Sequence, residues 1–229
     1  MRVHVAFIPD EAAAAPTGIV IDVLRATSTI AQALAAGYER VLCVPELDDA
    51  RALRAELPDS VVGGERDATR VEGFDVGASP REFLEPRART LILSTTNGTR
   101  SIATAAERCD VVLLGSLLNL DAVTAAARGR GEDVAILCAG FKGRFALDDA
   151  YCAGRVVQLL GGEPTDAAVA ADAIARAYPT ALAGLNARTY GPPGLEEDIA
   201  FCARESVLEA VPRFAGMRGP AAEIGRAHV

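Results

Sequence analysis

Hydroxyl, amide and charged side chains gather in four short segments, each of which follows an apolar run. The apolar runs have the length and β-branched composition of buried strands. The polar segments carry two complementary chemistries, because carboxylates suit hard cations while arginine forks and backbone N–H groups at helix N-termini suit phosphate-like anions. The four segments are 22–29, 64–80, 94–100 and 138–149.

The carboxylates of these segments are candidate ligands for Mg²⁺. Asp22 directly follows Ile-Val-Ile, so its carboxylate stands at the end of a buried strand. Mg²⁺ accepts one or two carboxylates together with waters and substrate phosphate oxygens, and Glu65 offers a second group of this kind. Alternatives remain for the others: Asp148 and Asp149 also suit the N-cap and first turn of a helix, and Asp75 also suits an Asx turn.

Three arginines lie a few residues beyond predicted strand ends: Arg25, Arg66 and Arg100. The planar guanidinium binds phosphate, sulfonate or carboxylate through two parallel hydrogen bonds. Surface charge explains any one of these arginines, because all but one of the 23 basic residues are arginine. Three at equivalent positions nevertheless favour a pocket for an anion.

The segment Thr95-Thr-Asn-Gly-Thr99 lies between a predicted strand and a predicted helix. Backbone N–H groups at a helix N-terminus favour an anion, and threonine hydroxyls add neutral donors. A single Thr or Asn N-cap is the alternative interpretation. The run of hydroxyl and amide residues, together with Gly98, exceeds what one cap needs, so we expect it to contact an anionic ligand.

Composition excludes several kinds of partner. The formal net charge of −8, the aromatic content of 5% and the absence of tryptophan argue against binding to nucleic acid or an anionic membrane. No apolar run approaches the roughly 18 residues of a membrane span, and 1–10 resembles a first strand more than a signal peptide. Five cysteines without a C-x-x-C pair predict a reducing, cytoplasmic location. The oligomeric state stays open, with a homodimer as one option.

Several catalytic motifs are missing. There is no P-loop, no G-x-G-x-x-G after a strand, and the two histidines stand near the chain ends, which disfavours a Ser-His-Asp triad or a histidine-rich metal site. Cys138 and Arg144 do have the C-x5-R spacing of cysteine phosphatases, in which a thiolate attacks phosphorus. No histidine precedes Cys138, so a buried cysteine at a strand end is the favoured interpretation, with the thiolate enzyme kept as an alternative.

The periodicity of the chain predicts a three-layer α/β/α fold with a largely parallel or mixed sheet, in a single domain over 1–229 or in two subdomains that meet near residue 130. We expect 163–187 to be helical with a break near Pro179, 196–208 to be helical, and 211–214 to be a last edge strand. The predicted strands are 3–8, 18–24, 41–44, 60–63, 90–94, 111–115 and 134–138, and the predicted helices are 28–36, 47–57, 98–108, 120–128 and 147–160. Ligands of such sheets bind at the carboxyl ends of strands, where the polar segments lie.

Together the polar segments resemble the 2-phosphosulfolactate phosphatase (ComB) family of coenzyme M biosynthesis. The resemblance runs along nearly the whole chain, and it implies a Mg²⁺-dependent hydrolase that converts 2-phosphosulfolactate, or a related small phosphorylated hydroxy acid, to sulfolactate and phosphate. A non-catalytic homologue that binds an anionic metabolite is the alternative. The matching motifs are Asp22-Val-Leu-Arg-Ala-Thr-Ser-Thr-Ile30, Gly64-Glu-Arg66, Gly73-Phe-Asp-Val-Gly-Ala-Ser-Pro80, Thr95-Thr-Asn-Gly-Thr-Arg100, Gly115-Ser116 with Asn119, Ala139-Gly140, Leu147-Asp-Asp149, Cys152-Ala-Gly154 and Glu197-Asp-Ile-Ala-Phe-Cys202.

Taken with the polar segments, the resemblance implies roles for particular residues. Two positions depart from the family pattern: Ala78 replaces an asparagine and Asp148 replaces a glutamate. We expect either change to alter the fit of the substrate without abolishing metal binding. Catalysis is expected from Asp22, Arg25 and Glu65, and metal binding from Asp22, Glu65, Asp148 and Asp149. Substrate binding is expected from Arg25, Thr27, Ser28, Arg66, Ser79, Thr95, Thr96, Asn97, Gly98, Thr99, Arg100 and Asn119.

Overall fold

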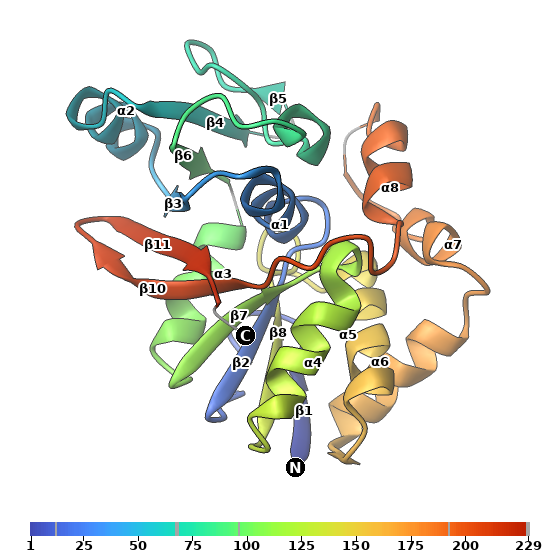
Figure 1. Ribbon diagram of the computed structural model, residues 1–229. Coiled ribbons are helices and arrows are strands. Elements are labelled where there is room, and N and C mark those ends of the chain that lie inside the picture. Colours follow the sequence, from blue (N-terminus) through green and yellow to red (C-terminus); the bar gives the residue numbers. More distant parts are fainter. Residues whose placement is uncertain (12, 67–68, 96, 192, 228–229) are drawn as a thin grey trace.

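Short apolar strands alternate with helices along the chain and build one mixed sheet with helices on both faces (Figure 1). The computed structural model describes residues 1–11, 13–66, 69–95, 97–191 and 193–227. The strands are β1 (Arg2–Ala6), β2 (Thr17–Ile21), β3 (Arg40–Val44), β4 (Ser60–Arg66), β5 (Thr69–Arg70), β6 (Thr90–Ser94), β7 (Val111–Gly115), β8 (Val134–Cys138), β9 (Glu163–Pro164), β10 (Pro212–Arg218) and β11 (Ala221–Arg226). The predicted α/β/α class is confirmed.

The helices cover the sheet between these strands. They are α1 (Ala26–Ala36), α2 (Leu47–Glu56), α3 (Gly98–Ala106), α4 (Leu120–Gly129), α5 (Leu147–Leu160), α6 (Asp166–Arg176), α7 (Ala181–Asn186) and α8 (Glu196–Cys202), with short 3₁₀ turns η1 (Pro80–Phe83) and η2 (Leu117–Asn119). The break predicted near Pro179 is confirmed, because α6 and α7 flank it. No helix in the described part of the chain combines the length and the hydropathy that crossing a bilayer requires.

The sheet consists of two parallel blocks joined by an antiparallel hairpin. Strands follow the order β5-β4-β6-β3-β11-β10-β7-β2-β8-β1-β9. The β4, β6 and β3 strands are mutually parallel, as are β7, β2, β8 and β1, whereas β11 pairs antiparallel with β3 and β10 pairs antiparallel with β7. The sheet is therefore mixed, and each block brings its own set of carboxyl ends.

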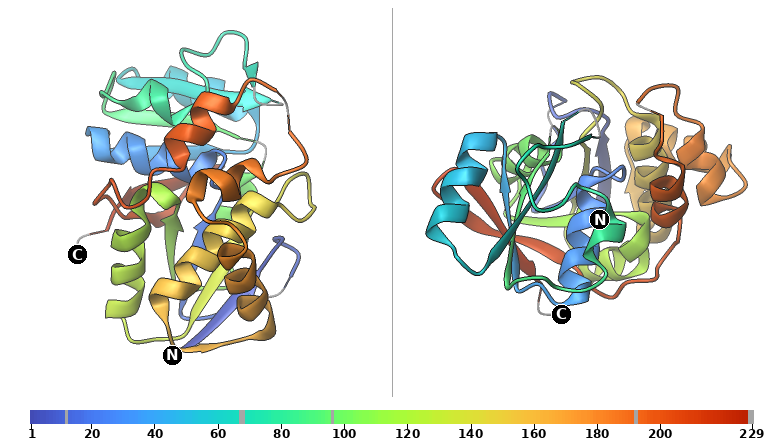
Figure 2. Two further views of the ribbon diagram at one scale, coloured as in Figure 1. Left: turned by 90° about the vertical axis from the view of Figure 1, so that its right-hand side faces the viewer. Right: turned by 90° about the horizontal axis from the view of Figure 1, so that it is seen from above.

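Strand alternation divides the core between the two faces of the sheet. In the β2 strand, Ile19 and Ile21 pack with Val156 of α5, while Val20 points to the opposite face, where Ile30 of α1 lies. Helices α1 and α3 thus lie between the two blocks, with α4, α5 and α6 on one outer side and α2 on the other (Figures 1 and 2). Burial on both faces is the reason these strands read as continuous apolar runs.

The register sets the polar segments at matching heights. Ile21 pairs with both Gly115 and Cys138, so Asp22 emerges level with the start of the loop after β8. In the other block Ser94 pairs with Gly64, so Glu65 and Thr95 emerge side by side. Because the carboxyl ends of parallel strands meet at one edge, the expected clustering of these segments has a direct geometric cause.

Two predictions about the C-terminal region are wrong. Residues 211–214 were expected to form an edge strand, but β10 and β11 form a hairpin inside the sheet, where Ile224 of β11 is fully buried in the core. The helix expected over 196–208 ends at Cys202, because the backbone N–H groups of Ser206 and Leu208 donate to the carbonyls of η2. This extended segment leads the chain from α8 back into the sheet.

Candidate active site

One cleft opens where the carboxyl ends of both parallel blocks converge. Its walls come from the loops after β2, β4, β6 and β8, from the start of α5 and from the connection between α7 and α8. The residues that line it are Asp22, Leu24, Arg25, Ala26, Glu65, Ala78, Thr95, Asn97, Gly140, Phe141, Lys142, Asp148, Asp149, Arg188, Tyr190, Gly191 and Leu195.

Four carboxylates share this cleft. Asp22, Asp148 and Asp149 are buried, and Glu65 is half-buried. Burial, together with the charges of Asp148 and Glu65, raises the pKa of Asp22 to about 7, although the Ala26 N–H and Arg25 act in the opposite direction. Buried like charges destabilise one another, so this arrangement favours either protons or a cation in the cleft.

Asp149 ties three segments together. Its carboxylate accepts hydrogen bonds from the backbone N–H of Val23 at 2.9 Å and of Gly140 at 3.0 Å, so α5 holds the loops after β2 and β8. Burial and repulsion from Asp148 and Asp22 raise its pKa well above the ordinary value. Since both oxygens are engaged by backbone donors, Asp149 is suited to fix the shape of the cleft.

Asp148 is held by a tyrosine from the α7–α8 connection. The Tyr190 hydroxyl donates a short hydrogen bond to Asp148 Oδ1, and the Tyr190 ring stacks on Phe141 with centroids 4.5 Å apart. Burial raises the pKa of Asp148, while the bond from Tyr190 opposes that rise. Burial and the nearby Asp148 charge raise the pKa of Tyr190, so its hydroxyl keeps its proton and acts as the donor.

Arg25 is buried at the N-terminus of α1 and forms an ion pair. Its Nη1 lies 2.6 Å from Oδ2 of Asp198 in α8, and the side chains retain only 9% and 7% of their exposure. Oδ1 of Asp198 accepts a hydrogen bond from the Ser79 hydroxyl at 2.6 Å. Asp198 therefore fixes Arg25 from the side while Arg25 lines the cleft, and Ser79 supports this pair from η1.

The N-terminus of α3 approaches Asp22 closely. A Cβ added at Gly98 would lie 2.4 Å from the Ala26 Cβ and 2.9 Å from Asp22 Oδ2, so only glycine allows this approach. Asn97 Oδ1 accepts a hydrogen bond from the Lys142 backbone N–H at 3.2 Å, which links the loops after β6 and β8. Thr95 and Asn97 line the cleft, and the expected contribution of Thr96 lies outside the described residues.

Several other expected site residues bond to the protein itself. The Thr27 hydroxyl donates to the Asp22 carbonyl at 2.9 Å, and the Ser28 hydroxyl donates to the Val23 carbonyl at 2.8 Å, so both brace the turn that carries Asp22. Asn119 is fully buried in η2 and bonds to the Ser116 N–H and to the Leu114 and Ala210 carbonyls. The structure does not bring Asn119 to the cleft.

Arg66, Thr99 and Arg100 surround a different cavity, of about 570 Å³, beside the β10–β11 hairpin. The Arg66 guanidinium bonds to the carbonyls of Glu65 and Pro45 and lies 3.1 Å from the Ser94 hydroxyl. Of the three arginines expected to share one pocket, the structure brings only Arg25 to the cleft of the buried carboxylates.

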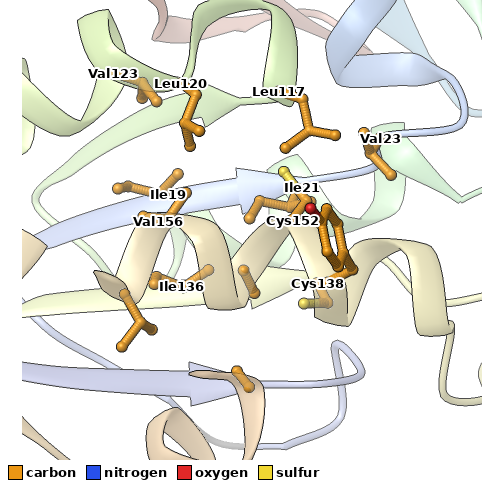
Figure 3. Packing of buried hydrophobic residues seen from close by; sticks show 14 of the residues in the cluster. Ile19, Ile21, Val23, Leu117, Leu120, Val123, Ile136, Cys138, Cys152 and Val156 are labelled. Carbon is orange, nitrogen blue, oxygen red and sulfur yellow. The ribbon is translucent and has the colours of Figure 1, made fainter. Parts of the chain in front are cut away.

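Cys138 lies in the core (Figure 3). It is not among the residues that line the cleft. Its side chain packs in the same cluster as Ile136 and Cys152, and it is 1% exposed. Burial and the nearby charge of Asp149 raise the pKa of the Cys138 thiol well above its ordinary value. A nucleophilic cysteine needs the thiolate, so the cysteine-phosphatase alternative is not favoured.

The loop between α7 and α8 supplies residues that the sequence patterns did not assign to the site. Tyr190 and Arg188 line the cleft, although no strand precedes them and no periodicity marks them. Asp198 falls in one of the motifs that carried the family resemblance, which was the available signal for its role. Lys142 also lines the cleft; it lies in the polar segment 138–149 but was not among the expected site residues.

Carboxylates and cationic side chains that share a cleft at strand ends are typical of enzymes that hydrolyse phosphate esters. A family model described as 2-phosphosulpholactate phosphatase matches residues 4–216. A probable 2-phosphosulfolactate phosphatase of Thermus thermophilus is 42% identical over 239 aligned positions, which cover 99% of this chain and 100% of the relative. Another from Symbiobacterium thermophilum is 37% identical, with 90% and 94% covered, and one from a Synechococcus species is 40% identical, with 85% and 87% covered.

The chain belongs to the 2-phosphosulfolactate phosphatase family, a family of phosphoric monoester hydrolases. The resemblance drawn from the motifs is thereby confirmed.

Proposed function

We propose that this protein is a Mg²⁺-dependent phosphatase that hydrolyses 2-phosphosulfolactate to sulfolactate and phosphate. The family membership supports the substrate, which the resemblance associates with coenzyme M biosynthesis. The observation that carries the chemistry is the group of buried carboxylates in the same cleft as Arg25. The absence of disulfides among the five cysteines supports a reducing compartment such as the cytoplasm.

The donor set of the cleft fits Mg²⁺. Its groups are hard carboxylate oxygens, and no thiol or imidazole lines the cleft among the described residues. As placed, no three acidic, cysteine or histidine side chains of the described ranges form a ready metal site. Asp22 and Asp148 would hold the ion, which would neutralise phosphate charge. Burial raises the pKa of Asp22 to about 7 because it disfavours the charged carboxylate, and a bound cation would stabilise that charged form.

The remaining residues position the substrate and water. Arg25 offers its guanidinium to phosphate oxygens, and the ion pair with Asp198 holds it in place. Glu65 orients the attacking water and accepts its proton as the water oxygen bonds to phosphorus and the ester P–O bond breaks. The leaving oxygen of sulfolactate then takes up a proton, which Glu65 returns through water, so the products are sulfolactate and phosphate. Asp149 keeps the loops after β2 and β8 together, so the cleft is preorganised for this step.

A homologue that only binds an anionic metabolite is the competing function. A pure anion binder gains nothing from four carboxylates beside Arg25 unless a cation intervenes. To separate these functions, phosphate release is measured for 2-phosphosulfolactate and a panel of other small phosphorylated hydroxy acids in Mg²⁺. We expect the highest kcat/KM for 2-phosphosulfolactate. Saturable binding of these compounds without release of phosphate would refute the enzymatic proposal.

A further inference from the structure

Among the residues that the structure describes, Arg188 is a cation of the cleft without a hydrogen-bond or ion-pair partner. It lies two residues beyond α7 in the loop to α8, and its side chain is half-buried. It makes no hydrogen bond or ion pair with any residue that the structure describes. Arg188 lines the cleft together with Asp148 and Tyr190, so its charge faces the same space as the buried carboxylates.

Gly191 provides the surface on which the Arg188 guanidinium rests. A Cβ added at Gly191 would lie 2.3 Å from Arg188 Nη1, closer than real contacts allow. Gly191 also has φ of 99°, which other residues rarely adopt. The backbone of Gly191 therefore limits where the guanidinium lies without using its N–H donors, and these donors can bind a ligand.

The exposure of the cationic side chains varies along the cleft. Arg25 is nearly fully buried, next to buried Asp22, whereas Arg188 is half-buried and Lys142 is exposed. If the reacting phosphate occupies the buried end beside Asp22 and Arg25, the rest of the substrate extends toward Arg188. A substrate whose remaining part carries a carboxylate or a sulfonate would place an anion there.

We propose that Arg188, seated on Gly191, binds an anionic group on the non-reacting part of the substrate and thereby selects phosphorylated acids over simple phosphate monoesters. This inference rests on the proposed function. The planar fork matches both carboxylate and sulfonate oxygens. The competing role is charge balance for Asp148, which would affect all substrates equally because Asp148 serves the reacting phosphate.

Four substrates separate these roles and the two anions. They are 2-phosphosulfolactate, 2-phospholactate without the sulfonate, the phosphate ester of 2-hydroxyethanesulfonate without the carboxylate, and ethyl phosphate with neither. We expect Arg188→Gln to lower kcat/KM for 2-phosphosulfolactate about 30-fold and for ethyl phosphate less than threefold. Of the two intermediate esters, the one that retains the contacted anion should show the full loss. An equal loss on all four, or no loss on any, would overturn the proposal.

A second variant tests whether the position of the Arg188 guanidinium matters, and a binding measurement tests the contact without hydrolysis. Gly191→Ala keeps the charge of Arg188 but displaces the guanidinium, so it should reproduce the selective loss, while exposed Arg128→Gln in the last turn of α4 should change nothing. Calorimetric titration with sulfolactate should show weaker binding to the Arg188→Gln variant, with unchanged affinity for inorganic phosphate. If the wild type hydrolyses no ester but binds sulfolactate through Arg188, the proposed function fails while this inference stands. Unchanged sulfolactate affinity would overturn the inference.

Discussion

Two groups of buried polar side chains were expected in the site, one to bind the substrate and one to bind the metal, and their hydrogen bonding differs. Around Asn119, the amide and the hydroxyl of Ser116 bond to each other and to backbone groups. Around Asp22, buried carboxylates crowd against one another, and burial raises the pKa values of Asp22 and Asp148. The first group is complete without a ligand, whereas the second is stabilised only when protons or a cation enter.

This difference separates buried polar groups that stabilise the fold from buried polar groups that serve binding or catalysis. A buried polar group whose hydrogen bonds are satisfied by the protein contributes to stability and to a unique conformation. A buried set of like charges costs stability and persists where it serves binding or catalysis. Substitutions in the two groups should therefore affect different properties of the protein.

The largest expected effect is on activity in the cleft. Asp22→Asn removes a formal negative charge but keeps an oxygen for the Ala26 N–H, so we expect kcat/KM to fall at least about 1,000-fold without loss of stability. Steady-state phosphate release and thermal unfolding measure both quantities. The control is Asp121→Asn, at an exposed position in the first turn of α4. Activity within tenfold of wild type would remove Asp22 from the reacting centre.

For Asn119→Ala we expect a loss of stability with little change in activity. This change leaves buried groups of Ser116, Leu114 and Ala210 without partners, which should lower the free energy of unfolding by about 2–4 kcal/mol. Urea unfolding measures this loss. At temperatures where the variant is folded, kcat/KM should stay within about twofold of wild type, and a drop comparable to that of Asp22→Asn would show that Asn119 serves the substrate.

An intermediate effect is expected for the residue that holds Arg25. Asp198→Asn weakens the buried ion pair and frees Arg25 to move, so kcat/KM should fall by about 10- to 100-fold. Asp198→Glu should recover part of this loss, because it restores the charge. Neighbouring Glu197 is exposed and pairs with Arg81, so Glu197→Gln is the matched control. Equal activities of the two neutral variants would argue against the positioning role.

The smallest expected effect is the pH dependence of stability without divalent cations. Because the pKa of Asp22 is raised from 3.8 to about 7, the folded chain retains a proton that the unfolded chain releases. The resulting stabilisation is present below pH 4 and is lost as the pH rises to 7. Urea unfolding in chelator at pH 5 and pH 8 should show that Asp22→Asn reduces this loss by about 2 kcal/mol. An identical pH dependence in both proteins would contradict the assignment.

The sequence predicted the parts of the site that strands position. Asp22, Glu65 and Thr95 follow or end continuous apolar runs, and the carboxyl ends of parallel strands lie at one edge of a sheet, so their meeting there could be anticipated. Tyr190 and Arg188 could not be anticipated, because they reach the cleft through a connection between helices whose path depends on tertiary packing.

The place of a strand in the sheet also could not be predicted where the strand pairs with segments distant in the sequence. Residues 211–214 were expected at the edge of the sheet, yet β10 pairs with β7 through Arg213 and lies inside the sheet. The three arginines looked equivalent along the chain, but Arg66 and Arg100 line a different cavity, beside the β10–β11 hairpin that lies between the two parallel blocks. Sequence spacing carries no information about the insertion of this hairpin.

The most direct test of the account is phosphate release from 2-phosphosulfolactate as a function of Mg²⁺. Wild-type protein treated with EDTA should lose its activity, and added Mg²⁺ should restore it. The Asp22→Asn variant should need a much higher Mg²⁺ concentration, because one negative ligand is missing. Full activity of the wild type in EDTA, or the same Mg²⁺ dependence in both proteins, would contradict the claim that the buried carboxylates hold the cation used for hydrolysis.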